Sequence, residues 1–259
     1  MVKLKNYNVV LKQIVLILTF FILFSCAEKK QLVSKIEGKN IEITDTLSES
    51  TEIESFVKPY REHIDSDLNL VLSHAPKTLD KNGEWQTPMG NFISDITLEM
   101  ATPIFKLKEN KNIAICFLNH GGIRSIISAG DVTARTAYEV MPFENSAFVV
   151  GLKGEQLLEM IQYFISEKKP HPLSGMTFTI DKDNNPKNIF IQGKKLDLKE
   201  VYYVVTSDYL LNGGDNMLFF KKAIDKYDLD YKLRNMIIDY FKTHNEIIAS
   251  QSIRVKKEN

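Results

Sequence analysis

Three short apolar runs place the strongest constraint on how this chain folds. They lie at Ile113–Leu118, Ala147–Leu152 and Val201–Thr206. All three runs are short and mostly apolar, and β-branched or aromatic residues make up at least half of each, which predicts strands. The runs at 113–118 and 201–206 have no polar alternation, and this is typical of a strand covered on both faces. We therefore expect a sheet with these strands at its centre.

Helical patterns alternate with the strands along the chain. Gln156–Ile165 carries an amphipathic stripe, and Thr87-Pro88 is expected to open a helix through Asn91–Ala101. A hairpin is expected around Asp183–Pro186. Helices interleaved with strands and a hairpin predict an α+β fold, a mixed β-sheet with packed helices. The other expected elements are an edge strand at Ile41–Leu47, a helix from Thr51 that Pro59 kinks or delays, a strand through Leu68–Leu72, a short helix at Val132–Val140, hairpin strands at Met176–Ile180 and Ile189–Gln192, and a last helix at Tyr231–Phe241.

The charge and cysteine content exclude several classes of protein. The 259 residues carry 33 basic and 33 acidic side chains. There is no basic excess to neutralise phosphates, so no nucleic-acid partner is expected. Two cysteines, Cys26 and Cys116, exclude a disulfide framework and a four-cysteine zinc site. Cys116 lies in an apolar run and is expected to be an inert core residue.

The first 25 residues have the pattern of an export signal. They contain three lysines, no acid and an apolar run at Ile14–Phe24. The end of this run and the two residues after it, Leu23-Phe24-Ser25-Cys26, resemble the lipobox of bacterial lipoproteins. That resemblance implies cleavage before Cys26 and its acylation, although Phe24 is bulkier than the pattern usually has. A plain signal peptide, or an uncleaved anchor with a bystander cysteine, is the alternative.

The mature chain is then divided into a tether and a domain. Residues 26–39, which begin with the lipidated cysteine, are polar and lysine-rich, and residues 40–259 form the domain. Loss of residues 1–25 leaves 234 residues with a net charge of −3. The predicted location is the bacterial cell envelope, on a lipid anchor that faces the periplasm.

Three loops next to the predicted strands carry the candidate binding residues. Functional groups in α/β architectures gather at strand ends. Paired glycines let a backbone approach a ligand, while Asn, Arg and Asp supply amide, cationic and anionic groups. The predicted site residues are Asn119, Gly121, Gly122 and Arg124 after the first run, Phe143 before the second, and Tyr209, Asn212, Gly214 and Asp215 after the third.

These residue types suit a nucleoside or a nucleotide. Phe143 and Tyr209 offer two aromatic faces for a base, Asp215 offers a carboxylate for vicinal hydroxyls, and Arg124 offers a cation for an anion. Turns, core packing and a solvated surface charge explain each loop singly, so the prediction depends on the loops occurring together.

Four motifs, in order, carry a family resemblance. They are Met89-Gly-Asn-Phe-Ile-Ser-Asp95, Asn119-His-Gly-Gly-Ile-Arg124, Val140-Met-Pro-Phe143 with Val149–Gly154, and Tyr209-Leu-Leu-Asn-Gly-Gly-Asp215. Over residues 40–255 the chain resembles the C-terminal, substrate-binding domain of 5'-nucleotidases.

The resemblance implies roles for these residues. Phe143 and Tyr209 would sandwich the base, Asp215 would hold the ribose, and Asn119 and Arg124 would contact base or phosphate. Gly90-Asn91 and Asp95 would shape the pocket. Two departures matter: the stretch Gly83–Met89 lacks the arginine that relatives carry there, and His120 stands where the family motif has a further glycine.

The same resemblance implies a missing catalytic half. Full-length 5'-nucleotidases cleave phosphate esters with a separate N-terminal domain that holds two metals. The five histidines of this chain show no such ligand spacing: His63, His74, His120, His171 and His244. We therefore expect no catalytic residue, metal or cofactor here, and two divalent metals in a separately encoded metallophosphatase partner.

Three functions remain open from the sequence. The chain is the binding half of a split 5'-nucleotidase, or it is a standalone periplasmic nucleotide-binding lipoprotein that feeds a transporter. The third alternative is a metal-free hydrolase that uses His120 with Asp215 or Glu144.

Overall fold

A computed structural model describes residues 4–22, 33–44 and 46–258, and it divides into two units at residue 51. In the first unit, helix α1 (Leu4–Ile22) lies within the predicted signal sequence, and residues 33–44 have no regular structure. The edge strand expected at Ile41–Leu47 is therefore wrong at 41–44, because no neighbouring strand pairs with it. Cys26 lies outside the described residues. Among those residues, no helix meets the length and apolarity needed to cross a membrane.

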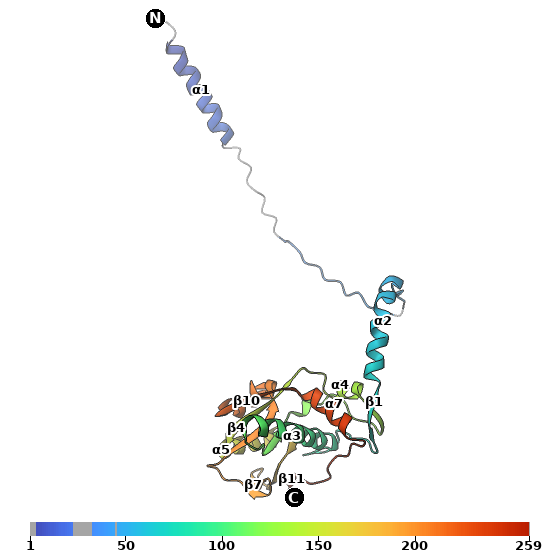
Figure 1. Cartoon of the computed structure of the whole chain (residues 1–259). Helices are drawn as coiled ribbons and strands as arrows, with labels where there is room; N and C mark the ends of the chain where they lie inside the picture. The colour runs from blue at the N-terminus through green and yellow to red at the C-terminus, as the bar shows by residue number, and fades with distance from the viewer. Residues whose placement is uncertain (1–3, 23–32, 45, 259) are drawn as a thin grey trace. The chain divides into compact units, whose positions relative to one another are not determined.

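The second unit, residues 52–259, contains the predicted α+β fold (Figure 1). Its helices are α2 (Thr51–Leu68), α3 (Pro88–Glu109), α4 (Ala134–Val140), α5 (Gly154–Glu167), α6 (Asp208–Leu211) and α7 (Leu233–Thr243). Its strands are β1 (Val71–Ala75), β2 (Ile115–Phe117), β3 (Gly130–Thr133), β4 (Ser146–Lys153), β5 (Leu173–Ser174), β6 (Met176–Ile180), β7 (Pro186–Ile191), β8 (Lys194–Lys195), β9 (Val201–Ser207), β10 (Asp225–Lys232) and β11 (Val255–Lys257).

The three apolar runs form the middle of a five-stranded sheet, as the sequence predicts. The strand order is β10-β4-β9-β2-β5, in which β2 and β9 run parallel and the other pairs antiparallel. A second sheet has the order β11-β6-β7-β8, and β1 pairs with β3. The fold is therefore a mixed-sheet α+β architecture.

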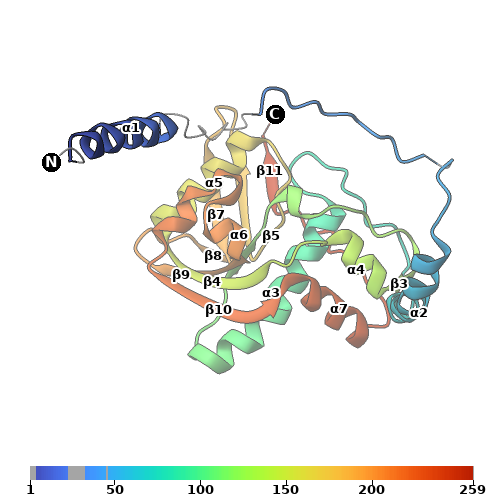
Figure 2. The ribbon, with the colours of Figure 1, turned by 90° about the horizontal axis from the view of Figure 1, so that it is seen from above.

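Both faces of the central sheet are buried, which explains the lack of polar alternation in its strands. In β9, Val205 packs in one hydrophobic core with α3 and α7, while Val204 packs in another with α5 and β6. Figure 2 shows α5 on one side of β4 and β9, and α3 on the other. Cys116 is fully buried and belongs to the α3 side.

Local signals set several helix boundaries. The Thr87 hydroxyl accepts a hydrogen bond from the amide of Gly90, and Pro88 occupies the first turn of α3, where a missing N–H costs nothing. The short helix predicted from residue 132 begins instead at Ala134, because Thr133 caps it and ends strand β3. Helix α2 begins at Thr51 and continues through Pro59, so the predicted late start is wrong.

Candidate functional site

Sheet topology brings the three predicted loops to one edge of the sheet. Because β2 and β9 are parallel, Asn119 and Tyr209 follow strand ends that lie side by side. Strand β4 is antiparallel to β9, with Ala147 opposite Ser207, so the start of β4 lies at this same edge. Phe143, three residues before β4, is thereby placed next to the other two loops.

A cavity of about 350 Å³ opens where these loops meet. It is lined by Asn119, Gly121, Gly122, Arg124, Phe143, Asn145, Tyr209 and Asp215. The predicted residues Asn212 and Gly214 line an adjacent hollow with Asn145 and Tyr209. Phe143 and Tyr209 are 41% and 45% exposed, which leaves much of each ring open to solvent.

Asp215 is at the centre of the polar contacts in the cavity. One carboxylate oxygen accepts a hydrogen bond from the Asn119 side-chain amide at 2.8 Å, and the other accepts one from the Tyr209 hydroxyl at 2.8 Å. Each oxygen has two lone pairs, so both retain capacity for a further donor. The hydrogen bond to Asp215 is the first cause that raises the pKa of Tyr209, so the phenol stays protonated and donates.

The Tyr209 ring packs on a glycine in the turn that carries Asp215. A Cβ on Gly214 would lie 2.4 Å from the Tyr209 ring, so the ring packs directly on the glycine backbone. Asp215 itself has a φ of 51°, in the left-handed region that aspartate tolerates better than most residues.

A buried arginine is hydrogen-bonded to the backbone of the loop that carries Phe143. Arg234, at the start of α7, is 5% exposed and donates hydrogen bonds to the carbonyls of Met141 and Phe143. It also pairs with Glu144. Glu144 is therefore engaged by Arg234.

A lysine that the sequence did not single out lies close to Arg124. Arg124 lies over the Phe143 ring, with its guanidinium carbon 5.9 Å from the ring centre. Lys81 donates to the carbonyl of Ile123 at 2.6 Å. Burial, followed by the charge of Arg124, lowers the pKa of Lys81. Lys81 lies in a loop before the Gly-Asn motif and has no local signature. Asn145, which lines the cavity, belongs to the same loop as Phe143 but is not among the predicted site residues.

His120 is half-buried and is not among the residues that line the cavity. Burial is the largest cause that lowers its pKa, followed by the charge of Lys81, while a hydrogen bond with the Pro170 backbone acts in the opposite direction. Its own amide donates to Nδ1 of His171 at 3.2 Å. No group of three His, Cys, Asp or Glu side chains within the described ranges is arranged to hold a metal ion.

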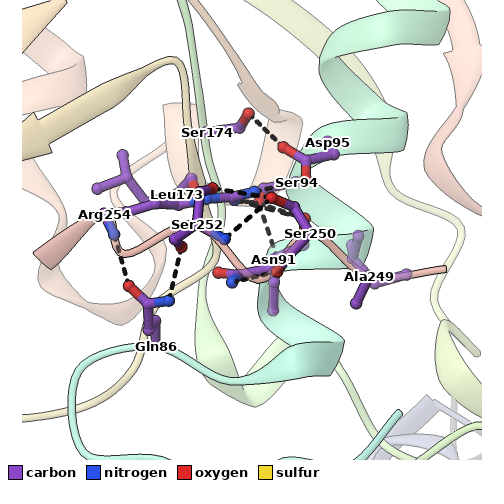
Figure 3. Close-up of polar contacts among 12 residues, drawn as sticks. Gln86, Asn91, Ser94, Asp95, Leu173, Ser174, Ala249, Ser250, Ser252 and Arg254 are labelled. Carbon is purple, nitrogen blue, oxygen red and sulfur yellow. Dashed lines mark hydrogen bonds and ion pairs between the residues drawn. The ribbon is translucent and has the colours of Figure 1, made fainter. Parts of the chain in front are cut away.

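The Gly-Asn motif binds the C-terminal segment of the chain instead of lining the cavity. Asn91 donates to the Ser250 carbonyl at 3.1 Å, and Asp95 pairs with Arg254 (Figure 3). Arg254 also donates to the Ser94 hydroxyl at 2.9 Å. The expectation that Asp95 helps to shape the pocket stays a prediction, since its described contacts lie in this network.

His171 makes the stability of the fold sensitive to acid. Burial is the main cause that lowers its pKa to about 4, from an ordinary value of 6.5. The unfolded chain therefore binds a proton below about pH 6.5 that the folded chain refuses until about pH 4. We expect this histidine alone to cost about 3 kcal/mol of stability between pH 7 and pH 4.

The measurement is urea unfolding of the wild type and of His171→Asn at both pH values. The variant lacks the titrating group, so its loss of stability on acidification is expected to be smaller than that of the wild type by this amount. Equal losses in the two proteins would show that His171 is not the group responsible.

Comparison with known proteins agrees with this architecture. Residues 70–222 match the family model described as "5'-nucleotidase, C-terminal domain". The chain is 24% identical to a 5'-nucleotidase of Vibrio parahaemolyticus, over 86% of this chain and 39% of that protein. It is 26% identical to a trifunctional nucleotide phosphoesterase protein of Bacillus subtilis, over 73% of this chain and 14% of that one.

A solved structure has the same fold. The 5'-nucleotidase precursor of Thermus thermophilus superposes with a TM-score of 0.67 at 23% identity, over 80% of this chain and 43% of that chain. This chain thus spans about two fifths of the length of these two 5'-nucleotidases, and a smaller share, 14%, of the longer phosphoesterase. With the family model matching more than half of its residues, the chain belongs to the 5'-nucleotidase C-terminal domain family.

Proposed function

We propose that this chain is the nucleotide- or nucleoside-binding half of a 5'-nucleotidase-type phosphohydrolase system and acts with a separately encoded metallophosphatase. The observation that carries the proposal is the cavity in which two half-exposed aromatic rings, a carboxylate and an arginine converge. This chain spans about two fifths of two 5'-nucleotidases, and in the proposal a second polypeptide supplies the catalytic part.

Each part of the cavity has a chemical role in this proposal. The rings of Phe143 and Tyr209 stack on the base, and stacking contributes about 1–3 kcal/mol per base face. Asp215 accepts hydrogen bonds from ribose hydroxyls, with the Asn119 amide and the Tyr209 hydroxyl keeping its carboxylate in place. Arg124 contacts the phosphate or the base edge. The partner's metals supply the attacking water, and this chain orients the substrate.

Calorimetry on the full chain tests the binding step. We expect AMP and adenosine to bind with micromolar to millimolar affinity, because the gross gain from stacking and charged hydrogen bonds is reduced by ordering costs. UDP-glucose and inorganic phosphate complete the panel. If none of the base-containing ligands binds, the proposal is refuted.

Reconstitution tests the division of labour. A metallophosphatase polypeptide without a substrate-binding domain is assayed for AMP hydrolysis with and without this chain, and Asp215→Ala serves as the matched control. An increase in turnover that the control lacks supports the split enzyme. Binding without any gain in turnover would instead favour the standalone lipoprotein that supplies a transporter.

The lipid anchor is part of the proposal. The basic residues and apolar run before Cys26 support acylation at that cysteine and a position on the bacterial envelope facing the periplasm. Cells expressing the chain are grown with a radioactive fatty acid, and Cys26→Ser is the control. Label that persists in the control would refute acylation at Cys26.

Gly214→Ala is expected to weaken nucleotide binding while leaving the fold intact. The added methyl group would overlap the Tyr209 ring, and this exposed ring moves more readily than the backbone. Loss of the stacking face costs about 1–3 kcal/mol of binding. A double-mutant cycle with Tyr209→Ala provides the check: Gly214→Ala adds nothing once the ring is gone. A further loss in that background would mean that the glycine acts independently of Tyr209.

A further inference from the structure

Two of the loops that line the cavity are hydrogen-bonded to a single segment of the chain, which includes helix α5 and the residues that follow it. Helix α5 contributes Tyr163, whose hydroxyl donates a hydrogen bond of 2.7 Å to the backbone carbonyl of Asp215. The residues that follow α5 contribute His171, whose Nδ1 accepts the amide proton of His120. The rings of Tyr163 and His171 lie 5.6 Å apart, centre to centre, so the two supports contact each other.

The loop after β2 is fastened to this segment at further points. The amide of Leu118 donates to the carbonyl of Pro172 at 3.0 Å, and the His120 side chain interacts with the Pro170 backbone. These contacts surround the position where His120 replaces the glycine of the family motif. The larger residue thus adds a link between the loop and the segment after α5.

The burial of His171 indicates that its Nδ1 atom is needed for the hydrogen bond with the His120 amide. The side chain is 3% exposed and is packed among the rings of Phe117, Tyr163 and Phe164. Because Nδ1 accepts a hydrogen bond, the proton is on Nε2, and that nitrogen has no hydrogen-bond partner within the described part of the chain. A buried polar atom without a partner is costly, and aromatic faces recover only part of the cost.

An apolar side chain would avoid that cost if the position served packing alone. The imidazole is explained by the acceptor that it offers to the His120 amide. Tyr163 likewise has a hydrogen-bonding role. Burial raises the pKa of its hydroxyl to about 12, so the hydroxyl stays protonated and donates to the Asp215 carbonyl.

We propose that His171 and Tyr163 are positioning residues that set the ligand affinity of the cavity. His171 holds residues 119–122, and Tyr163 holds the turn that carries Asp215. Because Asn119 also donates to the Asp215 carboxylate, the two loops form one connected unit on this support. This inference rests on the proposed function, in which the cavity binds a nucleotide.

The test compares variants that keep or remove each hydrogen-bonding atom. His171→Asn retains an acceptor the same number of bonds from the backbone as Nδ1, whereas His171→Leu removes it. Tyr163→Phe removes only a hydroxyl. Tyr202→Phe is the matched control, because its hydroxyl binds the Asp197 amide at the opposite end of β9.

Two readouts are measured on the full chain. Amide hydrogen exchange follows residues 119–122 and 213–217 without ligand, and calorimetry gives the affinity for AMP. We expect His171→Leu and Tyr163→Phe each to weaken AMP binding by about fivefold or more, as for a lost hydrogen bond, and to speed exchange in the loop each one holds. His171→Asn and Tyr202→Phe are expected to stay within about twofold of the wild type.

Three results would overturn the inference. The first is that both His171→Leu and Tyr163→Phe show the same amide hydrogen exchange and the same affinity for AMP as the wild type. Another is His171→Asn behaving like His171→Leu, and the third is an equal effect of Tyr202→Phe. If the wild type binds no AMP, the proposed function fails, and hydrogen exchange alone decides whether these residues position the loops. Should His171→Leu fail to fold, Tyr163→Phe decides the outcome in the same way.

Discussion

The double substitution Phe143→Ala/Tyr209→Ala is expected to weaken binding of AMP or adenosine by about 30-fold or more. Each ring stacks on one face of the base in the proposed complex, and each face is worth about 1–3 kcal/mol. Both rings are about half exposed, so their removal leaves the buried core unchanged. Calorimetry gives the affinities, and thermal unfolding checks that the fold is retained.

Phe190→Ala is the matched control for this double variant. Phe190 is an exposed aromatic residue at 39% and lies outside the cavity lining. Its loss is expected to leave nucleotide affinity unchanged. If the double variant binds AMP as tightly as the wild type, the aromatic clamp is wrong, even if the chain binds nucleotides by other groups.

The second large effect is expected at Arg254. Replacement by methionine is expected to lower the free energy of unfolding by about 3–5 kcal/mol, because it removes the cation that pairs with a partly buried carboxylate and one donor from several buried acceptors. Arg254 is 6% exposed, and its guanidinium donates to Asp95, the Ser94 hydroxyl and the carbonyls of Asn91 and Leu173.

Lys187→Met is the comparison for that substitution. Lys187 pairs with Glu258 near the same C-terminal strand, but both side chains are more than one third exposed. Exposed pairs contribute about 0–1 kcal/mol, so this variant is expected to unfold at nearly the wild-type urea concentration. Similar losses in the two variants would contradict the view that burial makes the Arg254 network important.

Much of the fold follows from local patterns in the sequence. The apolar runs predict β2, β4 and β9 to within two residues at every end, because burial on both faces leaves little polar alternation in them. Strand β10 was missed. Its sequence Asp225–Lys232 alternates charged and apolar residues at the sheet's edge, and the helix predicted from Tyr231 overlaps its end.

The site was predictable to the extent that strand ends determine it. Asn119, Phe143 and Tyr209 meet because their loops adjoin paired strands, and each loop has a recognisable composition. The supports behind them were not predictable. His171 contacts a residue 51 positions away, and Arg254 pairs with Asp95 across 159 positions. Neither His171 nor Arg254 carries a local signature.

The family match ends at residue 222, whereas the folded unit continues to the end of the chain. Strand β10 covers one side of β4, and α7 then carries Arg234 to the turn of Phe143. A chain cut at the end of the match would present β4 as a bare, apolar edge open to pairing with other molecules. The last 37 residues thus protect the domain from aggregation as well as shaping its cavity, and any shortened form of this domain needs to retain them.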